Sequence, residues 1–399
     1  LFVKPVDLNI YLSQLAIIKV WQKVVSFLMK KLGLIVNPVA GIGGSVGLKG
    51  SDGPEILKKA RELGAVPQAP KRAKQALREI SSLKDQIEII TYPGDMGENI
   101  AKDCGFNPTV IGLIDENNTT LKDTQNAAID MKKLGVDLIL FAGGDGTARN
   151  IYDAVGVGIP VLGIPAGVKI HSAVYGQSPK KAGELAKLFL QDKAVELKEV
   201  EVMDIDEDAF REERVVARLY GYLKVPFEKE FVQKRKSGGV AGEKASLASM
   251  ANYIVDTMFD DYIYIIGPGT TTRSIMERLG LDYTLLGVDV IYKKQLMAKD
   301  VTERELLKII DGKKAKIVVT IIGGQGYIFG RGNQQLSSAV INQVKKDNII
   351  VVATRDKINS IFGNPMLIDT GDDATNNMLE GYYKVVVGYG EFVTYKAIA

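Results

Sequence analysis

Short apolar runs that alternate with longer helical patterns are the feature that most constrains how this chain can fold. A strand-like run followed by an amphipathic helix is typical of parallel strands joined by helical crossovers. After Met29, the expected strands are 32–36, 87–91, 109–113, 137–142 and 160–164. The expected helices between them are 54–63, 70–83 and 120–135. This alternation predicts an α/β domain with a doubly wound, Rossmann-like sheet whose ligand lies at the carboxyl ends of the strands.

The second half of the chain repeats this alternation after a charged, strand-like stretch that starts near residue 196. Segments such as DYIYIIGPGTTTRSIMERLG combine a strand, a glycine-rich turn and a helix, so we expect a second, mixed α/β (α+β) domain. The predicted divisions are 1–28, 29–195, 196–350 and 351–399, the last being strands that return to one of the two sheets. The ligand site is expected in the cleft between the domains.

Residues 1–28 are of doubtful status, because Met29 opens MKKLGLIVNPVAG, which has the form of a natural start. Lys19 and Lys23 interrupt the apolar run, which is too short and too charged for a bilayer span. The small-residue cleavage site of a secretory signal is not recognisable. A translated leader or extension is the preferred interpretation, with a membrane-surface anchor as the alternative.

The charge balance of the chain argues against nucleic-acid and membrane partners. The 399 residues include 51 basic and 48 acidic side chains, and their net charge of +3 is spread along the chain. No extended basic field is expected from this pattern. A single cysteine, Cys104, excludes an internal disulfide, and a single histidine, His171, excludes a site built from several histidines. We therefore expect a cytoplasmic protein with no nucleic-acid or membrane partner.

Four glycine-rich turns follow predicted strands: NPVAGIGGSVGLKGSDG, AGGDGT, GPGTTT and IGGQGYIFGRGNQQ. Glycine lets a backbone approach a ligand closely and point successive N–H groups at it, and a following helix adds its dipole. Two such turns in each half of the chain favour a ligand that is rich in phosphates. None has the G-x-x-x-x-G-K-[ST] pattern of a P-loop, and the first lacks the strict G-x-G-x-x-G dinucleotide pattern.

Asp145 lies in the second of these turns, between Gly144 and Gly146, where a carboxylate would repel a phosphate. It could accept a proton from an attacking hydroxyl, or hold Mg²⁺ beside the phosphates. The structural alternative is a turn or helix N-cap residue. Thr147, at the start of the expected helix, could bond a phosphate or cap that helix. We predict a catalytic role for Asp145.

The combination of NPVAG with GGDGTARN resembles the NAD kinase and diacylglycerol kinase superfamily. With GIPAGVKIHSAVYG, GPGTTTRSIMERLG and GGQGYIFGRGNQQLS, the chain is similar to the ATP-NAD kinase-like branch over most of its length from Met29. The resemblance implies a kinase of NADP biosynthesis, which phosphorylates the adenosine ribose 2′-hydroxyl of NAD with ATP and a divalent metal such as Mg²⁺. Polyphosphate as donor, NADH or another hydroxyl acceptor, a lipid kinase and a non-catalytic NAD- or ATP-binding regulator stay open.

The resemblance also implies that Asp145 is the general base. The predicted nucleotide- and phosphate-binding residues are Asn37, Pro38, Gly41, Gly143, Gly144, Gly146, Thr147, Asn150, Gly167, Lys169, Gly269, Thr270, Thr271, Thr272, Arg273, Gly324, Gln325 and Asn333. GPGTTT is expected to take the place of the Thr-Gly-Ser-Thr-Ala-Tyr segment of typical NAD kinases, and their Asn-Glu or Asn-Asp pair has no clear counterpart. Metal ligands stay unknown, and a homo-oligomer, a dimer or tetramer, is expected.

Several candidates also have an ordinary structural interpretation. Lys169 could neutralise a phosphate or be solvated, and a lone histidine such as His171 is more often structural than an acid or base. Arg273 and Arg331 could clamp phosphate oxygens or form surface salt bridges. The amides that could contact a base edge, or merely form a polar turn, belong to Asn333, Gln334 and Gln335.

Overall fold

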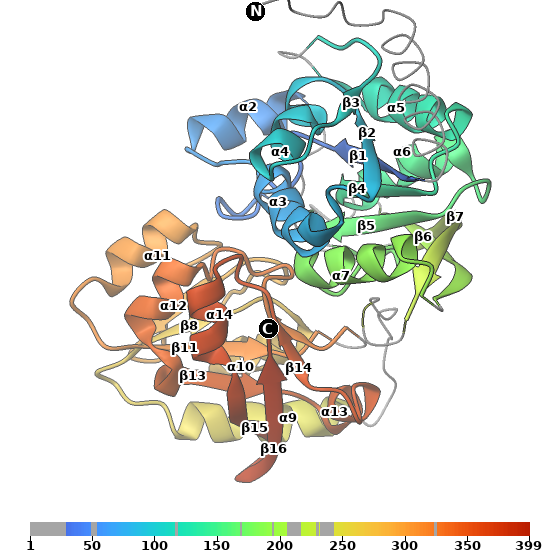
Figure 1. Cartoon of the computed structure of the whole chain (residues 1–399). Coiled ribbons are helices and arrows are strands. Elements are labelled where there is room, and N and C mark those ends of the chain that lie inside the picture. The colour runs from blue at the N-terminus through green and yellow to red at the C-terminus, as the bar shows by residue number, and fades with distance from the viewer. Residues whose placement is uncertain are drawn as a thin grey trace, which may run out of the picture.

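The computed structural model describes residues 29–48, 54–115, 119–167, 170–193, 195–205, 217–228, 231, 243–322 and 325–399. These residues form two α/β domains, each built on its own sheet (Figure 1). The leader or extension predicted for residues 1–28 lies outside the described residues.

The first domain is built on a five-stranded parallel sheet. Its strands are β1 (Lys30–Val36), β2 (Ile87–Thr91), β3 (Thr109–Val110), β4 (Leu138–Gly143) and β5 (Val161–Pro165). Their order, β3-β2-β1-β4-β5, shows that the chain moves outward from β1 and then returns to its other side. The predicted doubly wound fold is confirmed. Its switch point between β1 and β4 is the place where such sheets bind ligands.

Helices cover both faces of this sheet, as the alternating sequence pattern requires. They are α2 (Pro54–Glu62), α3 (Ala69–Ile80), η1 (Ser81–Leu83), η2 (Gly94–Met96), α4 (Glu98–Asp103), α5 (Leu121–Lys133), α6 (Asp145–Val155) and α7 (Pro179–Leu190). α3 packs against α7, and α5 packs against α6. β4, with the sequence LILFAG, is buried along its whole length between these layers. β3 is shorter than predicted, because only its two exposed residues pair with β2.

A two-stranded hairpin extends the core of the first domain. β6 (Glu196–Ile205) pairs antiparallel with β7 (Ala217–Phe227) and packs against α6. Its buried side chains Val202, Leu223 and Val225 lie in the same apolar cluster as the five-stranded sheet. The expected division after residue 195 assigns this hairpin to the second domain, whereas its apolar side chains pack in the first.

The second domain contains a mixed sheet of nine strands. They are β8 (Ile263–Ile266), β9 (Asp289–Tyr292), β10 (Gln295–Ala298), β11 (Ala315–Thr320), β12 (Tyr327–Phe329), β13 (Ile349–Val352), β14 (Met366–Ile368), β15 (Gly381–Gly388) and β16 (Glu391–Ile398). Their order is β10-β9-β8-β11-β13-β15-β16-β14-β12. The mixed character predicted for this domain is confirmed, since β8, β11, β13 and β15 run parallel, while β9 pairs antiparallel with β8 and β10, and β16 pairs antiparallel with β15. The C-terminal strands belong to this second sheet.

Both faces of the nine-stranded sheet are covered by helices. They are α9 (Glu243–Asp256), α10 (Thr270–Leu279), α11 (Glu303–Ile310), α12 (Ser338–Val344), η3 (Lys346–Asn348), α13 (Arg355–Ser360) and α14 (Asp373–Leu379). Successive residues of a strand point to opposite faces. Accordingly, Ile263 and Ile265 join the cluster that includes residues of α11, α12 and α14, while Tyr264 and Ile266 join the cluster of α9 and α10.

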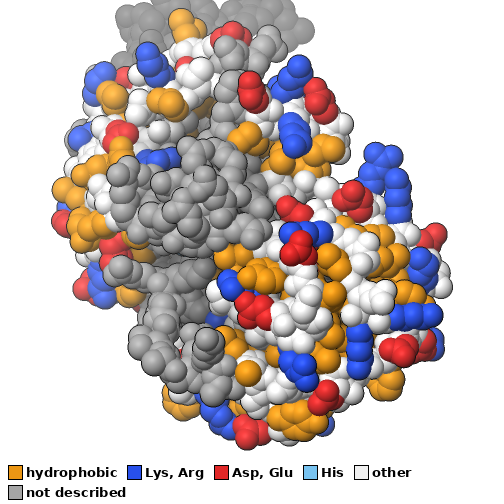
Figure 2. All heavy atoms as spheres, turned by 180° about the vertical axis from the view of Figure 1, so that it is seen from behind, with side chains coloured by type: hydrophobic (Ala, Val, Ile, Leu, Met, Phe, Trp, Pro, Cys, Tyr) orange, Lys and Arg blue, Asp and Glu red, His pale blue; other side chains and the backbone are white. Residues whose placement is uncertain are grey.

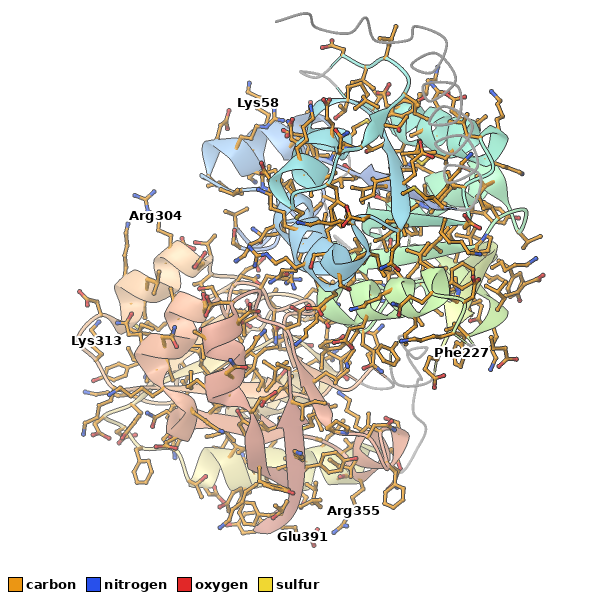
Figure 3. The ribbon with its side chains drawn as sticks, viewed as in Figure 1. Lys58, Phe227, Arg304, Lys313, Arg355 and Glu391 are labelled. Atoms are coloured by element: carbon orange, nitrogen blue, oxygen red, sulfur yellow. The ribbon has the colours of Figure 1, made fainter. Side chains whose placement is uncertain are left out.

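The surface carries charges of both signs. Lys and Arg side chains are interspersed with Asp and Glu on the face shown in Figure 2. One exposed ion pair, between Arg355 and Glu391 at 2.7 Å, lies at the end of the second domain that points away from the first (Figure 3). Within the described ranges, no helix has the length and apolar character needed to cross a bilayer.

Candidate active site

The glycine-rich turns of the two domains meet at the boundary between the domains. Gly44, in the turn after β1, lies against the side chain of Gln334, in the turn after β12. Gln325, between β11 and β12 of the second domain, donates a hydrogen bond from Nε2 to the carbonyl oxygen of Ile170 at 2.9 Å. Gly267 begins the turn after β8. A Cβ at this position would lie 3.7 Å from a side-chain carbon of Leu336, two residues after Gln334 in the chain.

Asp145 is the first residue of α6, and only 8% of its surface is exposed. Each carboxylate oxygen accepts one backbone N–H group: Oδ2 from His171 at 2.8 Å and Oδ1 from Ser172 at 3.0 Å. A negative charge in the first turn of a helix is also favoured by the helix dipole. Asp145 thus fastens the segment after β5 to the turn after β4. Its oxygens keep further lone pairs for a ligand, and its catalytic role stays a prediction.

Tyr175 binds the same segment to the turn after β4. Its hydroxyl donates to the carbonyl oxygen of Gly144 at 2.6 Å, and its fully buried ring packs edge-on against Phe141. Burial, and secondly the nearby charge of Asp145, hold the pKa of Tyr175 well above its usual value. The hydroxyl therefore stays protonated and serves as a permanent donor.

Glycine is required where three backbones approach one another at this edge of the sheet. A Cβ on Gly167 would lie 2.7 Å from the Cα of Gly144. Gly41, in the turn after β1, has a φ of +77°, and a Cβ there would overlap the carbonyl oxygen of Ala166. The turn after β1, the turn after β4 and the loop after β5 are therefore packed closer than side chains would allow.

A side-chain hydrogen bond connects the turns after β1 and β4. Asn37 donates from Nδ2 to Oγ1 of Thr147 at 3.0 Å, and its Oδ1 accepts from the N–H of Val39 at 3.2 Å. Pro38 lies between them in the chain. Gly143 leaves room for the Thr147 side chain, which a Cβ would overlap. The structure brings these predicted residues together, and their contact with a nucleotide stays a prediction.

A lysine from a helix distant in the chain forms hydrogen bonds at the turn after β8. Thr271 accepts a hydrogen bond from Nζ of Lys357, in α13, at 2.7 Å. The same Nζ lies 3.2 Å from the hydroxyl of Thr320, at the end of β11. Thr272 donates to the carbonyl oxygen of Gly269 at 3.0 Å, which closes the turn. A cation is thus held between the carboxyl ends of two neighbouring parallel strands, a position suited to an anionic ligand.

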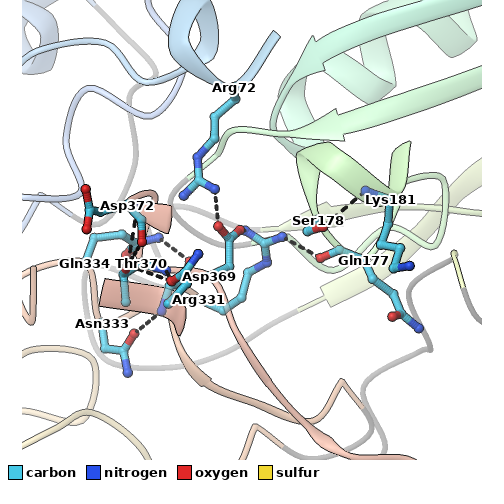
Figure 4. A network of polar contacts seen from close by, with 12 residues as sticks. Arg72, Gln177, Ser178, Lys181, Arg331, Asn333, Gln334, Asp369, Thr370 and Asp372 are labelled. Atoms are coloured by element: carbon cyan, nitrogen blue, oxygen red, sulfur yellow. Dashed lines mark hydrogen bonds and ion pairs between the residues drawn. The ribbon is translucent and has the colours of Figure 1, made fainter. Parts of the chain in front are cut away.

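A buried ionic network joins the domains beside these turns (Figure 4). Asp369, which follows β14, accepts a hydrogen bond from Arg72 of α3, and its Oδ2 lies 3.4 Å from Nη1 of Arg331. Arg331 also donates to the carbonyl oxygen of Gln177 at 3.3 Å. The exposed fractions of Arg72, Asp369 and Arg331 are 7%, 4% and 4%. We call these three residues the interdomain arginine network.

Tyr327 packs against Arg331 of the interdomain arginine network. The guanidinium of Arg331 lies 4.7 Å from the centre of its ring, a favourable cation–π arrangement. Burial raises the pKa of Tyr327 to about 12, although the charge of Arg331 acts in the opposite direction. Arg331 is therefore an interior group at the domain boundary and not the surface salt bridge that was its alternative.

Two other predicted site residues have structural partners. Arg273 donates from Nε to Glu277 at 2.7 Å along an exposed face of α10, which is the salt-bridge alternative. Asn333 accepts from the N–H of Gly330 and donates to the carbonyl oxygen of Ile328, both at 2.9 Å. Asn333 therefore braces its own turn, and its contact with a nucleotide stays a prediction.

The remaining predicted residues are less informative. His171 acts on Asp145 through its backbone, while its Nδ1 lies 3.5 Å from Asp145 Oδ2 without a hydrogen bond. Lys169 and Gly324 lie outside the described residues. Gly146 and Thr270 lie on the first turns of α6 and α10, and Asn150 lies on the second turn of α6. Their predicted contacts with a nucleotide stay predictions.

Arg72, Lys357 and Asp369 are residues that the sequence analysis missed. Arg72 and Lys357 lie in amphipathic helical segments, where basic residues are ordinarily solvated, so nothing local distinguishes them. Asp369 had a usable signal, because the segment MLIDTGDD has the form of the other turns, an apolar strand followed by polar residues and glycine.

The residues at the domain boundary fit a metal ion that arrives with phosphates. Among the residues that the structure describes, no three or more His, Cys, Asp and Glu side chains are grouped so that they could hold a metal ion. Mg²⁺ in nucleotide enzymes is usually bound by one or two carboxylates together with substrate phosphates and water. Asp145 is a carboxylate of this kind, because hydrogen bonds from two N–H groups leave its oxygens able to accept more.

Comparison with known protein families gives two matches, one in each domain. Residues 32–194 match the family described as the ATP-NAD kinase N-terminal domain. Residues 259–397 match the family described as the ATP-NAD kinase C-terminal domain. Together the matches cover both sheets and all four glycine-rich turns. Among curated protein sequences, no match to the chain is found.

Solved structures show weaker similarities. The crystal structure of a diacylglycerol kinase from Bacillus anthracis str. Sterne is 17% identical, with a TM-score of 0.23 over 44% of this chain and 48% of that chain. The chain thus spans about half the length of that kinase. UDP-GlcNAc 2-epimerase from Neisseria meningitidis is 12% identical, with a TM-score of 0.22 over 88% of this chain and 69% of the epimerase.

Proposed function

The chain belongs to the ATP-NAD kinase family, and from this premise we propose that it transfers the γ-phosphoryl group of ATP to the 2′-hydroxyl on the adenosine ribose of NAD. The products are NADP and ADP. The observation that carries the proposal is the position of Asp145, at the switch point of the first sheet and beside the glycine-rich turns of both domains. Phosphoryl transfer needs a proton acceptor beside a cradle for phosphates, and this place offers both.

The proposed roles follow from the hydrogen bonds of each group. Asp145 accepts the proton of the attacking hydroxyl through lone pairs that the N–H groups of His171 and Ser172 leave free. The backbone N–H groups of the glycine-rich turns take the phosphates. Lys357, held at the turn after β8, offsets part of the phosphate charge.

When bound, Mg²⁺ supplies further neutralisation of the phosphate charge, and Asp145 is the described carboxylate that fits it. A cytoplasmic location and a dimeric or tetrameric assembly belong to the same proposal. Light scattering on the purified protein tests the assembly.

The deciding experiment is product formation with NAD, ATP and Mg²⁺, in which NADP is measured with an NADP-specific dehydrogenase. We expect NADP to accumulate in proportion to the enzyme. Polyphosphate in place of ATP and NADH in place of NAD identify the preferred donor and acceptor. If no donor yields NADP while calorimetry shows that NAD binds, the proposed transfer is contradicted and a binding protein takes its place.

Lys357→Met is expected to raise the KM for ATP about tenfold, while kcat changes less. Methionine keeps the unbranched stem but removes the charge and the hydrogen bonds to Thr271 and Thr320. The variant would also lose the proposed bond between Lys357 and the phosphates of ATP. A hydrogen bond that involves a charged group contributes about 1.5–3 kcal/mol, which corresponds to a factor of ten or more in affinity. Steady-state kinetics with ATP as the varied substrate measures the effect.

Lys314→Met is the control for this variant, because Lys314 pairs with Asp261 at 2.8 Å on an exposed surface of the same domain. We expect it to leave both constants unchanged. An unaltered KM in Lys357→Met would show that the lysine only braces the turn.

A further inference from the structure

The second domain contacts the segment that holds Asp145 at two points. Gln325 donates from Nε2 to the carbonyl oxygen of Ile170 at 2.9 Å, and Arg331 donates from Nη2 to that of Gln177 at 3.3 Å. The two N–H groups that bind Asp145 belong to residues between these points. The environment of the carboxylate in the first domain is therefore set partly by side chains of the second.

Arg331 depends on Asp369 for its position. Its guanidinium is almost completely buried and its Nε has no hydrogen-bond partner, so its orientation rests on the Gln177 carbonyl, the Tyr327 ring and Asp369. Asp369 supplies the only ionic partner of Arg331 among the described residues, at 3.4 Å. Asp369 is in turn held by Arg72, whose helix begins beside the turn after β1. Removal of one partner from a buried ion pair leaves an uncompensated charge, which destabilises the arrangement of the groups that remain.

We propose that Arg72 and Asp369 are positioning residues for the reaction, which act through Arg331 on segment 170–177 and through this segment on Asp145. Figure 4 shows the first part of this connection, from Arg72 through Asp369 and Arg331 to Gln177. Neither residue needs to touch the reacting atoms. Misplacement of a catalytic group by about 1 Å can cost about 10²-fold in rate, so a remote brace of this kind can affect turnover strongly.

The first test measures amide hydrogen exchange in the full-length protein without nucleotide. In Asp369→Asn and in Arg72→Met, we expect the amides of His171 and Ser172 to exchange at least about tenfold faster than in the unaltered protein. Asparagine keeps the size of the aspartate, and methionine keeps the aliphatic packing of the arginine stem. If exchange at these two amides is unaltered in both variants, the proposal is overturned.

The second test is kinetic, and it rests on the proposed function. Both variants are expected to lower kcat for NADP formation about tenfold, with a smaller change in the KM for NAD. Arg72→Lys restores a cation within reach of Asp369 and is expected to recover most of the loss. If the two residues had a purely structural role, the variants would have a lower melting temperature, but kcat would not fall more than the KM for NAD changes. Arg72→Lys would then not recover kcat.

Arg355→Met provides the matched control, because it breaks an ion pair within the second domain, at the end that points away from the first (Figure 3). It should alter neither exchange at the two amides nor kcat. If Asp369→Asn does not fold, Gln325→Ala removes the other contact with segment 170–177 and is subject to the same exchange criterion. If the unaltered protein forms no NADP, the proposed function fails, while the exchange test still decides the positioning role.

Discussion

Asp145→Asn is expected to lower kcat for NADP formation by at least about 10²-fold while the protein stays folded. Asparagine has almost the same shape as aspartate, but its amide cannot accept the proton of the attacking hydroxyl. One amide oxygen can still accept an N–H group from His171 or Ser172, whereas the amide nitrogen faces the other N–H group as a second donor. We therefore expect a loss of stability of about 1–3 kcal/mol in addition. Turnover assays and denaturant unfolding measure the two effects separately.

A control with the same local chemistry distinguishes catalysis from stability. Asp289, a buried carboxylate of the second domain, also accepts two backbone N–H groups, from Thr284 at 2.6 Å and Asp300 at 3.0 Å. Asp289→Asn should cost a similar free energy of unfolding without a comparable loss of kcat. If Asp145→Asn loses only as much turnover as Asp289→Asn, Asp145 has a structural role and the general-base assignment is wrong.

Gly41→Ala is expected to destabilise the protein by about 2–4 kcal/mol and to reduce turnover at least about tenfold. The φ of +77° at Gly41 costs an alanine about 1 kcal/mol, because its Cβ crowds the backbone in the left-handed region. Its Cβ would also overlap the carbonyl oxygen of Ala166, and overpacking of a rigid contact costs about 1–3 kcal/mol more. Relief of this overlap would separate the turn after β1 from the loop after β5, both of which border the Asp145 site. Denaturant unfolding and NADP formation measure the two effects.

Gly64→Ala isolates the contribution of the overlap. Gly64 has a φ of +80°, almost the same as that of Gly41, but no atom lies within 4 Å of the position of its Cβ. We expect this variant to lose only the free energy of unfolding that an alanine costs at positive φ, about 1 kcal/mol. Its activity should be unchanged. Equal losses of stability in the two variants would mean that the backbone near Ala166 yields at little cost.

The core of the first domain was predictable from local patterns. Hydrophobic periodicity identifies apolar runs such as LILFAG and helices such as 120–135, and parallel strands joined by helices form a sheet with right-handed crossovers. The hairpin 196–227 was predicted as strand-like but was assigned to the second domain, whereas its apolar side chains pack in the first. Its polar alternation shows that one face is buried, and nothing in it says against which domain.

The candidate site was predictable to a smaller extent. Glycine-rich turns at strand ends indicated where a ligand would bind, and the meeting of Gln334 with Gly44 agrees with a site between the domains. Arg273 illustrates the limit, since a guanidinium near a glycine-rich turn looks the same in sequence whether it clamps a phosphate or pairs with Glu277. The direction in which a side chain points depends on helix rotation, which spacing alone does not specify.

By itself, the sequence determined the main elements, the doubly wound class of the first domain and the turns at which its strands end, because hydrophobic period and glycine placement are local properties. Only the tertiary structure decided which distant groups share a boundary. Arg72 and Asp369 are separated by 297 residues and form a buried pair, and Lys357 reaches Thr271 across 86 residues. The first pair crosses between the domains, and the second joins the helices that follow β8 and β13, two strands of one sheet that both pair with β11. In both cases burial, complete or partial, requires the charge to have a polar or charged partner.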